Sequence, residues 1–351
     1  MEQSKAAKIR QFNPNDLANE NSNIFGLPFL AEESDTILIP VPWEVTVSYG
    51  AGTAKGPQVI MEASKQVDLF HLSVRDGWKQ GIFMDDIPHD ILKTSKKYRK
   101  KAEKIIDALS EGPLSEEMKA LQEEINQQSK SLNAYVKAKS EKYLQQNKNV
   151  GLVGGDHSTP LGFIKAVAEK HKDISVLQID AHADLRNAYE GFTYSHASIM
   201  YNVLKEIPQV KKLVQVGIRD FCEEEYELIQ SEPKRIQCFF YEHMAQDKFN
   251  GKTWDTQCKE IISKLSKKVY ISFDIDGLDP KYCPNTGTPV PGGLEFHEAV
   301  YLIRKIVESG KQIVGFDLNE VGDSEDEWDA NVGARMLFEL CHWSAVSKVR
   351  K

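Results

Sequence analysis

Residues 175–184 read SVLQIDAHAD, a short and mostly apolar run that passes directly into a dense group of carboxylate and imidazole side chains. Apolar runs of this length, with little alternation, are typical of strands whose two faces are both covered, as in a parallel α/β sheet. Ligand sites in such sheets lie just beyond the carboxyl ends of the strands. The stretch therefore predicts a buried parallel strand at Ser175–Ile179 that ends in a functional site.

Seven further runs of this kind occur along the chain of 351 residues. Segments with a helical pattern lie between many of them, for example at residues 160–171 and 296–309. Strands that alternate with helices indicate βαβ units, so we predict an α/β fold with a mainly parallel sheet of about eight strands, formed by residues 1–351 as a single domain. The other seven predicted strands lie near Thr36–Val41, Gly81–Met84, Val150–Val153, Lys212–Val216, Gln237–Phe240, Val269–Phe273 and Gln312–Phe316.

One segment, at about residues 93–149, departs from this alternation. It is rich in Lys, Glu, Gln, Ser and Ala, and its only glycine, Gly112, is followed at once by Pro113. We predict two helices that are broken at this dipeptide, the second with Glu116 and Glu117 in its first turn. The pair is interpreted as a helical insertion, either a solvent-exposed hairpin or an oligomer contact or lid.

The overall composition narrows the class of protein. Asp and Glu outnumber Lys and Arg by 52 to 44, and the resulting formal charge of −8 disfavours nucleic-acid binding. No apolar run is long enough to span a membrane, and residues 1–22 lack the apolar region of a signal peptide. The five cysteines are odd in number and widely spaced, which argues against a disulfide framework. We therefore expect a cytoplasmic protein without a nucleic-acid or membrane partner.

Three other predicted strands also end in polar groups. These groups are GGDHS at residues 154–158, SFDIDGLDP at residues 272–280 and DLNE at residues 317–320. The carboxyl ends of parallel strands share one edge of the sheet, so the groups are expected to meet. Residues two apart in an extended chain lie on one face, so Asp180, His182 and Asp184 are expected to point into the site together. The same spacing pairs Asp274 with Asp276.

So many buried carboxylates need cations to offset their charge. Two divalent ions would balance the four aspartates of the DAHAD and DID motifs, and carboxylate ligands with some imidazole suit manganese better than zinc. Two such ions about 3.5–4 Å apart can acidify a water held between them and so generate hydroxide near neutral pH. The candidate ligands are His157, Asp180, His182, Asp184, Asp274 and Asp276.

The motifs GGDHS, DAHAD and SFDIDGLDP, with the later NEV, resemble those of the arginase–agmatinase family of ureohydrolases and occur in the order of that family. The resemblance runs from about Thr36 to the C-terminus, apart from the insertion. It implies a three-layer α/β/α fold around an eight-stranded parallel sheet, two Mn²⁺ ions per chain, and hydrolysis of a small cationic guanidino substrate to urea and an amine. It also implies a homo-oligomer, a trimer or a hexamer.

The resemblance assigns a role to each candidate ligand. In this assignment the first ion binds His157 and Asp184, the second binds His182 and Asp276, and both bind Asp180 and Asp274. Asp276 would also take the proton of the attacking hydroxide and pass it to the leaving amine.

Two further residues match positions of the family. Glu320 corresponds to an acidic residue that pairs with the substrate guanidinium, although in isolation it would be interpreted as an ordinary surface acid. His196, within YSHA, corresponds to a proton-shuttling histidine beside the site, although in isolation it would be interpreted as the start of a helix. A histidine suits the shuttle because its unperturbed pKa lies near neutrality.

The substrate is constrained by residues outside the metal motifs. The stretch Asp184–Arg186, with the following Tyr189–Gly191 and Ser195–Ala197, resembles the sequences of agmatinases more than those of arginases. The resemblance favours an agmatine-like substrate over arginine, although Arg186 could also be a structural ion-pair partner. The segment PWEVTVSYG at residues 42–50 is similar to a branch that includes nickel-dependent guanidine hydrolases. If the protein belongs to that branch, Trp43 and Thr46 shape a pocket for free guanidine. The alternative for Trp43 is that it packs in the hydrophobic core. Guanidine hydrolysis with Ni²⁺ is therefore the first alternative, followed by arginase, guanidinobutyrase and formiminoglutamase activities.

Three other classes of protein share parts of this pattern. A metallophosphoesterase also uses D-x-H, but that motif comes first there, whereas GGDHS precedes DAHAD in this chain. A zinc deacetylase of the histone-deacetylase type needs one Asp-His-Asp set and a catalytic tyrosine rather than two groups of aspartates. A non-catalytic scaffold with a structural metal would not need Glu320 and His196. We therefore predict a binuclear-metal hydrolase.

Overall fold

The sheet of this protein contains eight strands that are parallel throughout, in the order β2-β1-β3-β8-β7-β4-β5-β6. A computed structural model describes residues 4–19 and 21–349, so residues 1–3, 20 and 350–351 of the predicted single domain lie outside the described residues. All eight predicted strands are confirmed, and their observed ends differ from the predicted ones by a few residues. The strands are β1 (Thr36–Val41), β2 (Ile82–Met84), β3 (Asn149–Gly154), β4 (Ile174–Ile179), β5 (Val210–Ile218), β6 (Ile236–Phe240), β7 (Lys268–Asp274) and β8 (Gln312–Asn319).

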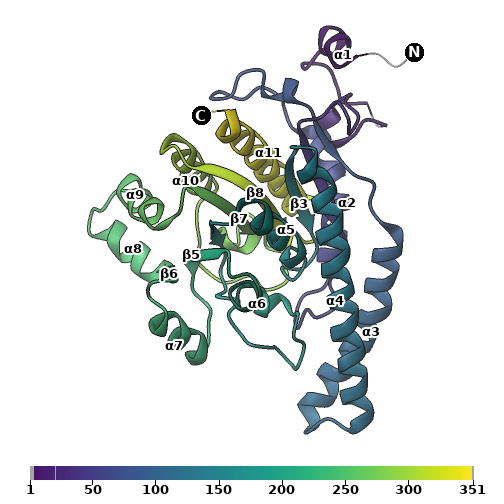
Figure 1. Ribbon diagram of the computed structural model, residues 1–351, viewed down its shortest axis with the longest axis vertical. Coiled ribbons are helices and arrows are strands. Elements are labelled where there is room, and N and C mark those ends of the chain that lie inside the picture. Colours follow the sequence, from purple (N-terminus) through teal and green to yellow (C-terminus); the bar gives the residue numbers. More distant parts are fainter. Residues whose placement is uncertain (1–3, 20, 350–351) are drawn as a thin grey trace.

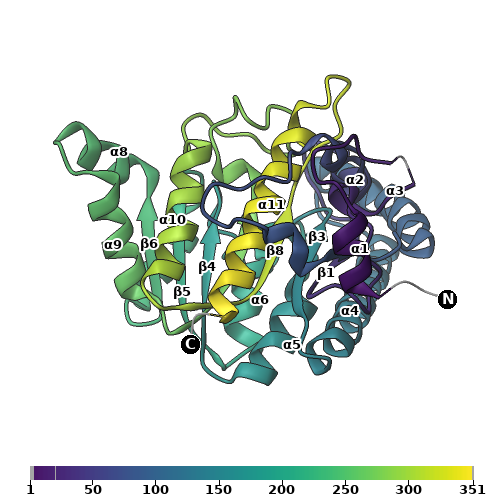
Figure 2. The ribbon, with the colours of Figure 1, turned by 90° about the horizontal axis from the view of Figure 1, so that it is seen from above.

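Helices cover both faces of this sheet, which gives the three layers expected from the sequence (Figures 1 and 2). One face carries α4 (Glu116–Gln145), α5 (Leu161–His171), α6 (Ile199–Glu206) and α7 (Glu223–Ser231), with α3 (His89–Glu111) alongside α4. The other face carries α2 (Gly56–Ala63), α8 (Tyr241–Phe249), α9 (Trp254–Lys264), α10 (Phe296–Glu308) and α11 (Trp328–Val349), and α1 (Lys5–Gln11) packs near the N-terminus. Within the described residues, no helix has both the length and the apolar character needed to cross a membrane.

The alternation of side chains along each strand fills two separate cores. In β7, Val269, Ile271 and Phe273 pack toward α10 and α11. Tyr270 points to the opposite face, where its ring lies 5.4 Å from that of Phe163 on α5. Because both faces are covered by apolar packing, most positions of the strands are apolar on either face, which explains the nearly continuous runs in the sequence.

The predicted break at Gly112 and Pro113 is confirmed. Helix α3 ends at Glu111, and α4 begins at Glu116 after Ser115, whose hydroxyl accepts a hydrogen bond from a backbone N–H of the first turn. The two helices lie side by side along one edge of the molecule (Figure 1). Helix α4 is not solvent-exposed throughout, because its Ile125, Leu132 and Val136 are buried in the core that it shares with α5 and β3.

Candidate metal centre and substrate cavity

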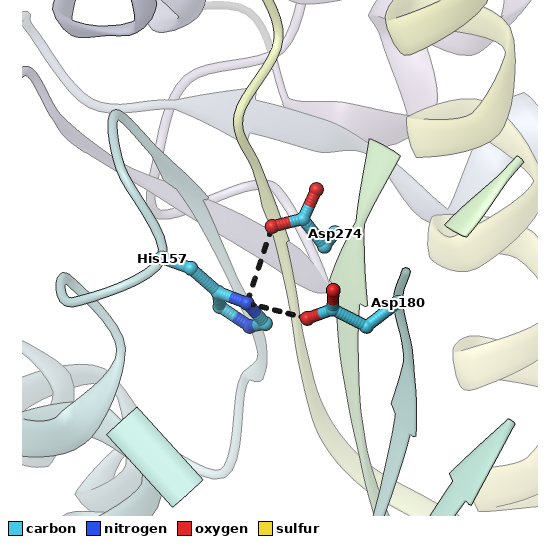
Figure 3. A group of neighbouring side chains, drawn as sticks. All are labelled: His157, Asp180 and Asp274. Carbon is cyan, nitrogen blue, oxygen red and sulfur yellow. Dashed lines mark ion pairs between the residues drawn. The ribbon is translucent and has the colours of Figure 1, made fainter. Parts of the chain in front are cut away.

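The polar groups at the strand ends meet at one edge of the sheet, as the sequence predicts. His157 follows β3, Asp180 follows β4, and Asp274 is the last residue of β7. Both carboxylates point toward the imidazole of His157 (Figure 3), whose Nδ1 lies 3.0 Å from Asp180 Oδ2 and 3.2 Å from Asp274 Oδ2. Asp184 Oδ2 lies 3.1 Å from the same nitrogen. One buried imidazole nitrogen therefore faces three buried carboxylates.

A second group lies beside the first and is centred on His182. Its Nδ1 lies 3.1 Å from Asp276 Oδ2 and 3.6 Å from Asp180 Oδ1. Asp180 thus presents one carboxylate oxygen to each histidine. The potential ligand atoms lie within 4.8 Å of one another in two sets, His157 with Asp180 and Asp274, and Asp180 with His182 and Asp276. The structure brings all six predicted ligands together in two adjacent groups that share Asp180.

The backbone reaches this geometry by turning, and the prediction of an extended chain is wrong at two places. Strand β4 already ends at Ile179, and Asp184 has a left-handed φ of 54°. Asp276 lies in the 3-10 turn η6 (Ile275–Gly277) instead of continuing β7. The turn after β7 allows two neighbouring ligands of one motif to approach different histidines, since Asp274 contacts His157 whereas Asp276 contacts His182.

Two buried atoms of the cluster have no hydrogen-bond partner, namely His157 Nδ1 and Asp276 Oδ2. Buried polar atoms in native proteins are nearly always satisfied, so these two atoms call for a partner. A cation between the facing nitrogen and oxygen atoms would supply it. Imidazole nitrogen together with carboxylate oxygen is a donor set that divalent transition-metal ions accept. The residues therefore fit a pair of divalent cations that share Asp180.

A hydrogen-bond relay behind His157 fixes the orientation of its ring. The Ser272 hydroxyl donates to Asp317 Oδ1 (3.0 Å), so it accepts from the Nε2–H of His157 (2.9 Å). The proton of the neutral imidazole is then on Nε2, and Nδ1 presents its lone pair to the carboxylates. This is the tautomer that a metal ligand requires. The sequence analysis missed Ser272 and Asp317, although Ser272 lies two residues before Asp274 on the same strand, a spacing that could have revealed it.

Burial and mutual repulsion control the charges of the cluster. Burial raises the pKa of Asp184 to about 7, and the charge of Asp180 adds to the effect. The pKa of Asp274 is raised well above its usual range by burial and by the charges of Asp276 and Asp180. Burial by itself lowers the pKa of His157, but the carboxylates around it outweigh this effect and raise its pKa well above the usual value. A bound cation would relieve the accumulated negative charge.

Glu320 lies next to this cluster, directly after β8. Its Oε1 accepts a hydrogen bond from the backbone N–H of His157 (2.8 Å), and its own backbone adopts a left-handed φ of 62°. Burial and the neighbouring charge of Asp156 raise the pKa of the Glu320 carboxyl well above its usual range. Gly287 borders its other oxygen, where an added Cβ would lie 3.4 Å from Oε2. The Glu320 carboxyl thus lies beside the candidate metal centre, where the hydrogen bond to its Oε1 fixes its position.

A cavity of about 140 Å³ opens beside His182 and Asp184, and His196 and Arg186 lie in its wall. Burial, together with the nearby positive charges of His182 and His157, lowers the pKa of His196 to about 3, so its ring is neutral at pH 7. Arg186 Nε lies 3.8 Å from Glu225 Oε2, as expected for an ion-pair partner. The cavity therefore places one residue of each candidate metal group beside two further predicted site residues, His196 and Arg186.

Acidic and aromatic side chains complete the wall of the cavity. The ring of Tyr189 lies under the guanidinium of Arg186 at 4.9 Å and meets the ring of His196 edge-on at 6.1 Å. Asp220 is mostly exposed at the rim, and its Oδ2 lies 3.8 Å from His182 Nε2. The sequence analysis did not single out Asp220, whose only local signal is its position shortly after β5.

Known proteins share both the sequence pattern and this architecture. The profile of the arginase family matches residues 34–342. The chain belongs to the arginase family. It is 31% identical over 291 residues to the N(1)-aminopropylagmatine ureohydrolase of Thermus thermophilus, an alignment that covers 83% of each chain. The protein of the same name from Thermococcus kodakarensis is 30% identical over 312 residues, which cover 88% of this chain and 90% of that relative.

Solved structures with a similar fold superpose on most of this chain. The proclavaminate amidino hydrolase of Streptomyces clavuligerus superposes with a TM-score of 0.71 at 22% identity, over 95% of this chain and all of that one. The structure titled agmatine ureohydrolase of Thermoplasma volcanium gives a TM-score of 0.68 at 23% identity, over 91% and 92% of the two chains. The predicted arginase-like fold, the family and the enzyme class, a hydrolase of linear amidines, are confirmed.

Three of the four predicted substrate-binding residues of this arginase-family protein, Trp43, Thr46 and Glu320, are not among the residues that line the cavity. Trp43 and Thr46 are fully buried, whereas Ser48 of the same segment lines the cavity. The carbonyl of Trp43 accepts from the backbone N–H of Asp156 (2.8 Å). A Cβ at Gly155 would approach that carbonyl oxygen to 1.9 Å, so glycine is required there. The packing ties this segment to the GGDHS loop, and a role of Trp43 and Thr46 in substrate binding stays a prediction.

Proposed function

We propose that this arginase-family protein hydrolyses an agmatine-type guanidino compound, in which the guanidinium carries an amine-bearing tail, to urea and the amine. The observation that carries the proposal is the carboxylate of Asp180, which offers one oxygen to each of two His/Asp groups. Such sharing suits a binuclear centre. The proposed ligands are His157, Asp180, His182, Asp184, Asp274 and Asp276, with two Mn²⁺ ions as the first candidate and Ni²⁺ as the alternative.

The divalent ions, when bound, would supply Lewis-acid charge and an activated water nucleophile. Asp276 is the proposed proton acceptor, since its Oδ2 lacks a hydrogen-bond partner while its Oδ1 is held by the backbone N–H of Ala181 (3.0 Å). The proton would then pass to the leaving amine. His196 is proposed to exchange protons between the site and solvent, because its ring lies with His182 in the wall of the cavity.

Glu320 is the proposed partner of the substrate guanidinium. A buried carboxyl with a raised pKa gains most from a cation that can enter its pocket. A guanidinium presents planar N–H donors that match the two oxygens of a carboxylate. Because Glu320 Oε1 is fixed by the His157 backbone, pairing with it would hold the guanidinium carbon beside the ligand cluster.

The wall of the cavity favours a substrate whose tail is also cationic. Asp220 contributes an exposed carboxylate at the rim. Arg186 is stacked on Tyr189, and its Nε lies 3.8 Å from Glu225 Oε2, contacts that favour a structural role over binding of a substrate carboxylate. The two relatives at 30% and 31% identity are named for a substrate, N(1)-aminopropylagmatine, that extends agmatine by a further amine-bearing arm. These features support an agmatine-type substrate.

The test is urea release from a panel of guanidino compounds by protein reconstituted with Mn²⁺ or with Ni²⁺. The panel contains agmatine, N(1)-aminopropylagmatine, arginine, guanidinobutyrate and guanidine. We expect the compounds with amine tails to have the largest kcat/KM. Urea from guanidine alone would replace the proposal with guanidine hydrolysis. Hydrolysis of p-nitrophenyl phosphate without urea from any member of the panel would contradict the ureohydrolase function in favour of a phosphoesterase.

A further inference from the structure

Two loops supply part of the wall of the substrate cavity. The loop at residues 43–52 supplies Ser48, and the loop at residues 185–198 supplies Arg186, Tyr189 and His196. Both loops are contacted by the helical pair α3 and α4, which lies along their side of the molecule (Figure 1). The shape of this part of the wall therefore depends on how these helices hold the loops.

Helix α4 holds the second loop through side-chain amides. Asn126 brackets it, with Nδ2 donating to the carbonyl of Gly191 (3.3 Å) and Oδ1 accepting from the N–H of Thr193 (2.9 Å). Gln122 Nε2 donates to the carbonyl of Glu190 (2.9 Å). A Cβ at Gly191 would come within 2.0 Å of Gln122 Nε2, so only a glycine permits this close approach. Three hydrogen bonds thus converge on residues 190–193.

The turn that these bonds hold is also closed by two backbone hydrogen bonds of its own, from Tyr189 N–H to the carbonyl of Phe192 (3.3 Å) and from Phe192 N–H to the carbonyl of Tyr189 (2.8 Å). Glu190 has a φ of 52° and Gly191 a φ of 78°, two left-handed residues in succession. A non-glycine residue in this region is unfavourable and persists where its surroundings impose it. Tyr189 and His196 lie on either side of this turn, and their rings meet edge-on in the cavity wall.

Helix α3 holds the first loop in the same manner. The guanidinium of Arg99 donates to the carbonyl of Val47 and also pairs with Glu103 (Nε–Oε1, 3.2 Å). The hydroxyl of Ser95 accepts from the N–H of Glu44 (3.0 Å). Both helices have buried faces in the core with the sheet, so they offer a rigid support for these contacts.

We infer that the α3–α4 pair sets the shape of the substrate cavity, and that Asn126, Gln122 and Arg99 are positioning residues that select which guanidino tail enters. These residues act through the loops that carry Tyr189, His196 and Ser48, and they lie outside the candidate metal ligands. The claim that these residues select the substrate by its tail rests on the proposed function. The claim that α3 and α4 fix the two loops does not. The two parts can therefore be tested separately.

The holding of the loop is tested by amide hydrogen exchange across residues 185–198 in Asn126→Ala. Loss of the bracket should accelerate exchange in this loop by about tenfold, because two hydrogen bonds to its backbone are removed. The matched control is Gln127→Ala, since Gln127 is exposed on the same helix and its side chain bonds only Glu123 among the hydrogen bonds of the described residues. Asn126→Asp keeps the acceptor for Thr193 and should restore part of the protection. Exchange equal to that of the control would overturn the inference.

The choice of tail is tested in the same variants by the ratio of kcat/KM for agmatine to that for guanidine. Asn126→Ala and Gln122→Ala should change this ratio by about fivefold or more, with metal content equal to that of Gln127→Ala. An unchanged ratio in active protein would overturn the selective role even if exchange is faster. Wild-type protein that releases urea from no compound would instead contradict the proposed function and the selective role with it, while the exchange measurement would still decide the holding of the loop.

Discussion

Two groups of histidines in this molecule behave in opposite ways because their neighbours differ. At the strand ends, His157 is buried and His182 is partly buried, which by itself lowers their pKa, but the facing carboxylates raise the pKa of both well above the usual value. In the core around α11, the ring of His342 stacks on that of His71 at 5.4 Å and lies 4.0 Å from that of Phe338. Burial lowers the pKa of His342 to about 4. The same side chain is a candidate ligand in one place and a neutral packing element in the other.

The hydrogen bonds of the rings explain the difference. His71 Nδ1 accepts from the backbone N–H groups of Ser73 and Val74, so its lone pair is satisfied and its Nε2–H donates to Glu339 (3.0 Å). His157 Nδ1 instead faces three carboxylates and meets no N–H donor among the described residues. A buried imidazole nitrogen that is surrounded by carboxylates indicates a cation site, whereas a nitrogen that accepts from N–H donors indicates a structural role.

The largest effect is expected from removing the imidazole of the second group. His182→Ala should lower metal content and reduce urea release by at least about 100-fold, because His182 is the only histidine in its set of facing ligand atoms. Metal analysis of the purified variant and its kcat/KM for agmatine measure the two effects. His243→Ala is the matched control, since His243 is exposed on α8. Normal metal content in His182→Ala would contradict the ligand assignment.

The strands and the motifs at their ends were predictable because each rests on a local pattern. Both faces of β4 and β7 are buried, so their apolar runs are continuous, and the polar residues begin where the apolar runs end. The left-handed turn at Asp184 was not predictable, because an aspartate there gives no signal that separates a turn from an extended chain. The extended spacing therefore predicted which side chains lie close together but not how they are arranged, and their role as ligands stays a prediction.

Other features that the sequence did not reveal depend on contacts between distant segments. Ser272 and Asp317 meet because β7 pairs with β8, and that register is not encoded by either strand alone. Asn126 and Thr193 meet because α4 packs against α5, which a helical pattern does not specify. Tertiary packing places these residues, so a single sequence identifies the elements but not their partners.

A smaller effect is expected from breaking the relay behind His157. Asp317→Asn removes the carboxylate that orients the Ser272 hydroxyl, and should weaken metal binding by roughly 10–100-fold. Ser272→Ala interrupts the same relay and should have an effect of similar size. Metal titration of the stripped proteins measures both, with Asp173→Asn as a control at an exposed acid. If both relay variants bind metal as tightly as the control, the ring of His157 does not need this support, and the contrast with the hydrogen-bonded ring of His71 is weakened.

The smallest expected effect concerns the neutral histidine of the core. Protonation favours the unfolded chain, because the pKa of His342 is about 4 in the folded protein and near 6.5 when unfolded. The contribution of the neutral ring to the free energy of unfolding is therefore present above about pH 6.5 and is lost as the pH falls toward 4. The expected loss between pH 7 and pH 5.5 is about 1 kcal/mol. His342→Leu should remove this part of the pH dependence, measured as the free energy of unfolding at the two pH values, while His243→Leu should keep it. His71 and Glu339 are the titratable groups that act on the His342 ring, and both remain in the variant. An equal loss of stability in wild type and His342→Leu would show that the folded protein does not lower the pKa of His342. The two groups of histidines would then differ in their neighbours but not in the direction of a pKa shift.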